Sequence, residues 1–168
     1  MLTTNQKGAI AETAIAAEAT RLGIEVYRPV AEGGRFDMIF AFAHGALERV
    51  QCKWANVCNG AVQVRACSAR RHREGFRVRS YTLEEIDALA VYCHENGRCY
   101  YLPAAMVVGR KIIHLRLAPA RNNQSERLHW AAEYALGAIA QLGERSAGSR
   151  KVGGSNPPSS TSTVRPLI

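Results

Sequence analysis

The sequence predicts an α/β fold in a single folded domain, on three observations. A helical pattern opens the chain, short apolar segments of strand length follow between turn residues, and the chain is long enough for one core. Its 168 residues, 47% of them apolar, are typical of one globular domain. Beyond position 137, glycine, serine, proline and threonine dominate and apolar periodicity ends. We therefore expect a folded domain over residues 1–137 and a mostly disordered tail over residues 138–168.

The first predicted element is a helix over residues 7–21, capped by Asn5 or Thr4 and ended by Gly23. Helical spacing places five residues on one face: Gly8, Glu12, Ile15, Ala16 and Ala19. This face is small and apolar except for the Glu12 carboxylate, and burying a bare charge is costly. Glu12 is therefore either a metal ligand or a salt-bridged residue at the edge of the face.

A predicted hairpin follows the helix. His44-Gly45 is a turn, and counting back from it places Asp37 roughly opposite residues 52–54. Strand patterns occur at residues 25–30, where Pro29 stops the strand, and at residues 36–43 and 47–54, which form the hairpin.

The hairpin brings a carboxylate, an amide and a cation together. Alternation along a strand puts Gln51 and Lys53 on one face and Cys52 on the other. With Asp37 beside them, a metal-binding carboxylate, a second ligand and a cation share one small volume. Phosphodiester cleavage needs a metal, a water and charge stabilisation at one phosphate, so these are candidate catalytic residues.

A strongly basic segment comes next, after a turn at Asn59-Gly60 and a predicted strand over residues 61–67. A positively charged, mobile loop suits a phosphate backbone, and a solvated loop without a ligand is the alternative. The candidate DNA-binding residues are Arg65, Arg70, Arg71, Arg73, Arg77 and Arg79.

The remaining elements follow from apolar patterns. Pro103 fits the first turn of a short helix through Val107. A second helix is expected over residues 125–136, because Leu128, Ala132 and Leu136 have helical spacing. Further strands are expected at residues 87–93, 99–102 and 111–117.

The composition favours a basic cytoplasmic protein. The net charge is +8 and the pI is about 9.6, which suits a polyanionic partner. No apolar run is long enough for a membrane span, and the first residues lack the plan of a signal peptide. The five cysteines form no C-x-x-C pair, so reduced thiols are expected, not a zinc site or a disulfide framework.

The order of Glu12 in a helix, Gly34-x-x-Asp37 and Gln51-x-Lys53 resembles the PD-(D/E)XK nuclease superfamily. Phe36 replaces the proline of the motif, and Gln51 replaces its second acidic residue. This Q-x-K variant is similar to the branch of group I intron-associated homing endonucleases, and the resemblance covers about residues 5–136.

The resemblance implies a restriction-endonuclease-like core, with a mixed β-sheet flanked by α-helices and Mg²⁺, or Mn²⁺ as a substitute, at its open end. Asp37 would bind the metal, Glu12 would bind it or orient its water, and Gln51 would offer its amide oxygen or position the phosphate. Lys53 would stabilise the attacking hydroxide or the developing charge. A neutral Gln51 favours one tight metal over two. Cutting both strands of DNA implies a homo-oligomer, a dimer or a tetramer.

The tail has an unusual feature, because Gly154-Ser155-Asn156-Pro157 can be encoded by GGTTCGAATCC, the T-arm of tRNA genes. Residues 151–158 look like the translated 3′ part of such a gene, although an ordinary linker has the same composition. The leading interpretation is a site-specific double-strand DNA endonuclease of the intron-homing type. The alternatives are a Holliday-junction resolvase, a DNA-binding protein that no longer cuts, and an inactive relic.

Overall fold

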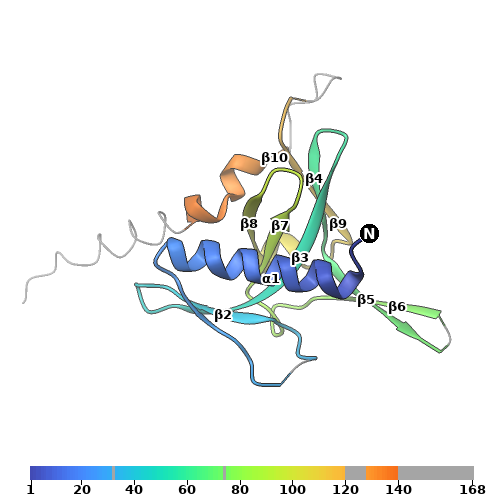
Figure 1. Ribbon diagram of the computed structural model, residues 1–168, viewed down its shortest axis with the longest axis horizontal. Helices are drawn as coiled ribbons and strands as arrows, with labels where there is room; N and C mark the ends of the chain where they lie inside the picture. Colours follow the sequence, from blue (N-terminus) through green and yellow to red (C-terminus); the bar gives the residue numbers. More distant parts are fainter. Residues whose placement is uncertain (32, 74, 120–127, 140–168) are drawn as a thin grey trace, which may run out of the picture.

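A mixed β-sheet with one long helix across it forms the centre of the molecule (Figure 1). The computed structural model describes residues 1–31, 33–73, 75–119 and 128–139. The helices are α1 (Thr4–Arg21), α2 (Ala104–Val107) and the 3-10 turn η1 (Ala131–Tyr134). The first strands are β1 (Glu25–Tyr27), β2 (Met38–Ala41), β3 (Leu47–Cys58), β4 (Ala61–Arg65), β5 (Cys67–His72) and β6 (Gly75–Ser80). The later strands are β7 (Ala88–Cys93), β8 (Arg98–Pro103), β9 (Ile112–Arg116) and β10 (His129–Trp130).

The long strand β3 organises the sheet. Its first half pairs antiparallel with β2 and parallel with β7, and its last residues pair with β4. The sheet runs β1-β2-β3-β4-β9-β10, while β7 joins β3 and carries β8. The pairs β3–β7 and β9–β10 are parallel and the others are antiparallel. The predicted α/β class with a mixed, restriction-endonuclease-like sheet is confirmed.

The two faces of the sheet are covered differently. On one face α1 packs Ile15 into a buried cluster with Phe40. On the other face Leu115 belongs to a second cluster, which the described part of the chain covers with α2 and η1. β7 contributes to both clusters, because Ala90 and Leu89 point to opposite faces. Among the described residues, no helix is long and apolar enough to cross a membrane.

The start of α1 differs by one or two positions from the prediction. Thr3 is the N-cap, and not Thr4 or Asn5, because it forms a capping box with Gln6. The buried stripe of α1 consists of Ala11, Ile15 and Ala19. Glu12 lies beside this stripe and is half-buried, so its carboxylate reaches the edge of the helix–sheet interface.

The basic segment is a β-hairpin, so its prediction as a mobile loop was wrong. β5 and β6 pair in register from Cys67 with Ser80 to His72 with Gly75, and they form a separate two-stranded sheet. The hairpin projects from the main sheet in Figure 1. Its sequence is rich in arginine and its clearest apolar alternation, Phe76-Arg77-Val78-Arg79, is only four residues long, so the usual signal for a strand is weak.

The predicted helix over residues 125–136 was also wrong where the structure describes it. His129 and Trp130 form β10, which pairs with β9, and a 3-10 turn follows. Ala132 is exposed whereas Leu136 is buried, so the two do not share a face as the helical spacing required. Pairing with β9 overrides the local preference. The earlier part of this prediction, and the tail beyond residue 139, lie outside the described residues.

Candidate active site

Asp37 is anchored to β3 by its backbone and by its side chain. Its N–H donates to the carbonyl of Val50 at 2.9 Å, and its Oδ2 accepts from the N–H of Cys52 at 2.7 Å. Because Met38 pairs with Val50, Asp37 stands beside Gln51, one to three positions from the predicted register. The five-residue connection between the strands accounts for this shift, since the prediction counted from a tighter turn.

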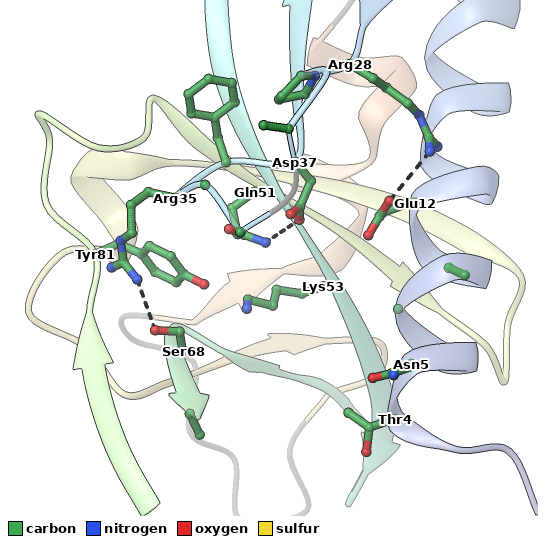
Figure 2. Close-up of a pocket in the computed structure, with 18 residues that line it drawn as sticks. Thr4, Asn5, Glu12, Arg28, Arg35, Asp37, Gln51, Lys53, Ser68 and Tyr81 are labelled. Atoms are coloured by element: carbon green, nitrogen blue, oxygen red, sulfur yellow. Dashed lines mark hydrogen bonds and ion pairs between the residues drawn. The ribbon is translucent and has the colours of Figure 1, made fainter. Parts of the chain in front are cut away.

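Gln51 and Lys53 share the face of β3 that the alternation predicted. Cys52 is 7% exposed and packs into the cluster under α1, while its two neighbours are half-buried and line a cavity. Gln51 Nε2 donates a hydrogen bond to Asp37 Oδ2. Figure 2 shows these three side chains of the motif close together, with the amine of Lys53 directed away from α1.

The cavity measures about 850 Å³ and lies between the start of α1, the segment before β2, β3 and the base of the β5–β6 hairpin. Glu12 faces it from α1, opposite Asp37 (Figure 2). The structure therefore brings together all four predicted catalytic residues: Glu12, Asp37, Gln51 and Lys53.

Burial shifts both ionisable members of the motif toward their neutral forms. Desolvation raises the pKa of Asp37, although the Cys52 N–H and the charge of Lys53 oppose this shift. Desolvation likewise lowers the pKa of Lys53, and Asp37 opposes it. The carboxylate is thus under-stabilised by the protein alone, a state that a bound cation would relieve.

Glu12 forms an ion pair with Arg28, whose Nη1 lies 3.6 Å from its Oε2. Both interpretations of Glu12 made from the sequence are thus compatible with its position, because a salt-bridged glutamate also faces the cavity. Arg28 was not predicted as a site residue. It follows β1 and precedes Pro29, and the sequence around it carries no motif that marks a cation at the site.

Arg35 and Tyr81 also line the cavity and were missed from the sequence. Arg35 lies over the Tyr81 ring, 4.7 Å from its centre, and Lys53 Nζ lies 5.3 Å from the same centre. Tyr81 is 2% exposed and follows β6, far from the motif in the chain. The one signal in the sequence that could have indicated Arg35 is its position two residues before Asp37.

Three of the candidate DNA-binding arginines, Arg65, Arg73 and Arg79, are described with their side chains and do not line the cavity. Arg73 lies between β5 and β6 and Arg79 lies on β6, both exposed, while Arg65 is exposed at the end of β4. The backbones of Arg70, Arg71 and Arg77 belong to β5 and β6. Arg79 already forms an ion pair with Glu85. The base of the hairpin, at Ser68, borders the cavity, so the hairpin that carries most of these arginines begins next to the site.

The chain was compared with known proteins. The model of a family described as PD-(D/E)XK endonuclease matches residues 2–137. The chain belongs to the PD-(D/E)XK endonuclease family. The family resemblance seen in the sequence is therefore confirmed, and the family supports the prediction that the chain is a nuclease.

The fold of this PD-(D/E)XK endonuclease is similar to that of a solved bacterial homing endonuclease, I-Ssp6803I. The two chains are 21% identical, with a TM-score of 0.66, and the match covers 90% of this chain and 100% of the other. At this identity the likeness shows a shared fold. No curated protein is similar enough in sequence to be matched to the chain.

Endonucleases of this family generally use divalent metal ions, and the donor set here fits one. Asp37 and Glu12 offer carboxylate oxygens and Gln51 an amide oxygen, the hard ligands that Mg²⁺ prefers. Among the described residues, no group of three or more His, Cys, Asp or Glu could hold a metal, and the amide of Gln51, which contacts Asp37, would be a further oxygen donor beside the two carboxylates. Its amide must rotate to present Oε1, because Nε2 now faces Asp37.

Proposed function

We propose that this chain is a Mg²⁺-dependent, site-specific double-strand DNA endonuclease of the intron-homing type, with Mn²⁺ as a substitute. The observation that carries the proposal is that three oxygen donors and one half-buried lysine line the same cavity, beside Asp37. A bound divalent cation supplies Lewis-acid charge at the scissile phosphate.

The residues of the cavity divide this work by their chemistry. Asp37, Glu12 and Gln51 hold the cation through oxygen atoms, with Asp37 fixed in place by the Cys52 N–H. Lys53 stabilises negative charge that develops on the phosphate, and its burial makes this interaction stronger than in water. We expect one cation per site, since Gln51 is neutral and the described lining of the cavity holds two carboxylates, those of Glu12 and Asp37.

The DNA backbone contacts the basic hairpin next to the cavity. Its arginines supply the salt-dependent, sequence-independent part of binding. One copy of a domain of this size offers one cavity, so cutting two strands takes a homo-oligomer, a dimer or a tetramer. Sedimentation velocity of the chain with and without DNA tests this assembly, and a monomer that cuts both strands would contradict it.

The activity test uses Mg²⁺ and two DNA substrates, a linear duplex that carries an uninterrupted tRNA gene and a four-way junction. The tRNA gene is chosen because residues 151–158 look like translated T-arm sequence. We expect one double-strand cut in the linear duplex, lost in Asp37→Ala and Lys53→Ala. Structure-selective nicking of the junction alone supports a resolvase and contradicts the homing proposal. If the chain binds DNA but cuts neither substrate, the proposal that it is an enzyme is contradicted.

We also propose that residues 140–168 take no part in cleavage. Their composition is dominated by glycine, serine, proline and threonine and carries no apolar periodicity. A chain truncated after Ile139 should cut the same site at a rate within about twofold of the full chain. A larger loss at equal thermal stability would show that the tail contributes to DNA recognition or catalysis.

A further inference from the structure

Arg35 joins the segment that carries Asp37 to the base of the basic hairpin. Its Nη1 donates to Ser68 Oγ at 3.1 Å, and its Nη2 donates to the carbonyl of Ser80 at 2.9 Å. Ser68 lies on β5 and Ser80 is the last residue of β6. One side chain, two residues before Asp37, therefore contacts both strands of the hairpin, and Figure 2 shows its contact with Ser68.

The same guanidinium forms an ion pair with Glu85. Its Nη2 lies 2.8 Å from Glu85 Oε2, and the two side chains are 22% and 15% exposed. At this burial, charge-assisted hydrogen bonds hold geometry more firmly than a surface pair does. Glu85 also pairs with Arg79, which is 64% exposed on β6. The carboxylate thus connects Arg35 to a cation on the DNA-facing hairpin.

Two further observations indicate that Arg35 positions other residues and does not only stabilise the fold. Arg35 Nε is buried and has no hydrogen-bond partner among the described residues, which costs stability that a purely structural contact would avoid. The guanidinium also covers the Tyr81 ring, against which Lys53 Nζ lies. Arg35 thereby touches the ring that limits where the Lys53 amine can go.

We propose that Arg35 is a positioning residue that couples the seating of DNA on the β5–β6 hairpin to the geometry of Asp37 and Lys53. This inference rests on the proposed nuclease function. The Arg35 contacts orient the hairpin relative to the cavity. Arg35 also positions Asp37 through the short backbone segment between them, and it positions Lys53 through the Tyr81 ring. A DNA strand held by the hairpin then lies in a defined position over the catalytic groups.

The test compares Arg35→Met with Arg49→Met in the full-length protein. Arg49 is a matched control, because its guanidinium binds Asp87 and the carbonyls of Leu83 and Glu84 but does not line the cavity. Single-turnover cleavage at saturating DNA with Mg²⁺ is the readout, alongside the unfolding midpoint in urea. A misplacement of about 1 Å at a catalytic group costs up to about 100-fold in rate.

We expect Arg35→Met to cut roughly 10–100-fold more slowly and Arg49→Met to cut within about twofold of wild type, at similar losses of stability. Arg35→Lys keeps the charge but not the planar fork, so it should remain at least about fivefold slow, and it serves if the Met variant does not fold. In a double-mutant cycle with Lys53→Met, the two losses should be less than additive.

Equal rates for Arg35→Met and Arg49→Met, or full rescue by Arg35→Lys, would overturn the inference while leaving the nuclease proposal intact. A wild-type chain that cuts no DNA would instead overturn the proposed function itself. The two failures are therefore distinguishable in one series of measurements.

Discussion

Two aspartates flank the same strand, and only one of them lies in the cavity. Asp37 precedes β2 and Asp87 precedes β7, so each stands beside β3 from a different side. Both are anchored alike: each backbone N–H donates to a β3 carbonyl at 2.9 Å, and each Oδ2 accepts a β3 N–H at 2.7 Å. Backbone anchoring alone therefore does not mark a catalytic carboxylate.

The partners of the two carboxylates make the difference. Arg49 binds Asp87 through Nε and Nη2, both at 2.9 Å, and lowers its pKa. Asp37 accepts a hydrogen bond from the Gln51 amide, and burial raises its pKa although the charges of Lys53 and Arg28 oppose this shift. A carboxylate whose charge is already balanced is a structural residue, whereas one left under-balanced beside a cavity can take a metal.

The largest effect on the cleavage rate should come from removing the Asp37 carboxylate, and removal of the Asp87 carboxylate is the comparison. Asp37→Asn should lower single-turnover cleavage by at least about 10³-fold, because it removes the central metal ligand. Asp87→Asn should cut within a few-fold of wild type at a temperature where it is folded. Equal rate losses in the two variants would break the comparison.

The next largest effect should come from Lys53→Met, which should lower the cleavage rate by about 10²–10³-fold. Its pKa is lowered by burial, so the cation is present below that pKa and is lost as pH rises through it. The ordinary pKa of a lysine side chain is about 10.4. The rate of cleavage by wild type should therefore begin to fall at a pH below this ordinary value. Lys53→Arg should retain part of the rate and lose this alkaline fall, which a pH–rate profile measures.

Gln51→Glu should sharpen the contrast by adding a second carboxylate next to Asp37. We expect metal affinity to rise by roughly tenfold, since a neutral ligand becomes an anion near a divalent cation. Calorimetric titration with Mg²⁺ measures this, and Gln51→Ala is the control that removes the donor. Weaker binding by the Glu variant would show that the amide does not face the metal.

The smallest effect concerns stability, and its sign should differ between the two aspartates. The lowered pKa of Asp87 means that its ionised form favours folding, a contribution present above about pH 4 and lost as pH falls through the folded-state pKa. Because this pair is about one-third exposed, Asp87→Asn should cost only about 1 kcal/mol at pH 7, measured by urea unfolding.

Asp37 has a raised pKa, so its ionised form opposes folding above that pKa in the absence of metal. Asp37→Asn should therefore leave the Tm of the metal-free protein unchanged or slightly higher. A clear fall in Tm would mean that the carboxylate is balanced by its neighbours after all.

The parts of the site that are local in sequence could be predicted. Asp37, Gln51 and Lys53 belong to one hairpin, whose turn and alternation place them together to within a few positions. Glu12 reaches them only through the packing of α1 on the sheet, which the family resemblance supplied and the residues alone did not. The contact of Arg35 with Glu85 spans 50 positions, so no local pattern reveals it.

The errors in the fold have a similar cause. The β5–β6 hairpin has backbone pairing with only a short apolar alternation in an arginine-rich segment, and β10 forms because β9 offers it an edge. Both depend on tertiary pairing, which periodicity does not encode. The strands with buried faces carried a clear pattern: β7 lies within one residue of its predicted position, and β3 begins where predicted but continues to Cys58, four residues past its predicted end.

The central claim is that Asp37 is a metal ligand and that its similarly anchored counterpart Asp87 is not. Titration of Mn²⁺ into wild type, Asp37→Asn and Asp87→Asn, followed by electron paramagnetic resonance, tests this without DNA or turnover. We predict that Asp87→Asn binds Mn²⁺ like wild type and that Asp37→Asn binds at least about tenfold more weakly. Wild-type affinity in Asp37→Asn, or an equal loss in both variants, would contradict the account.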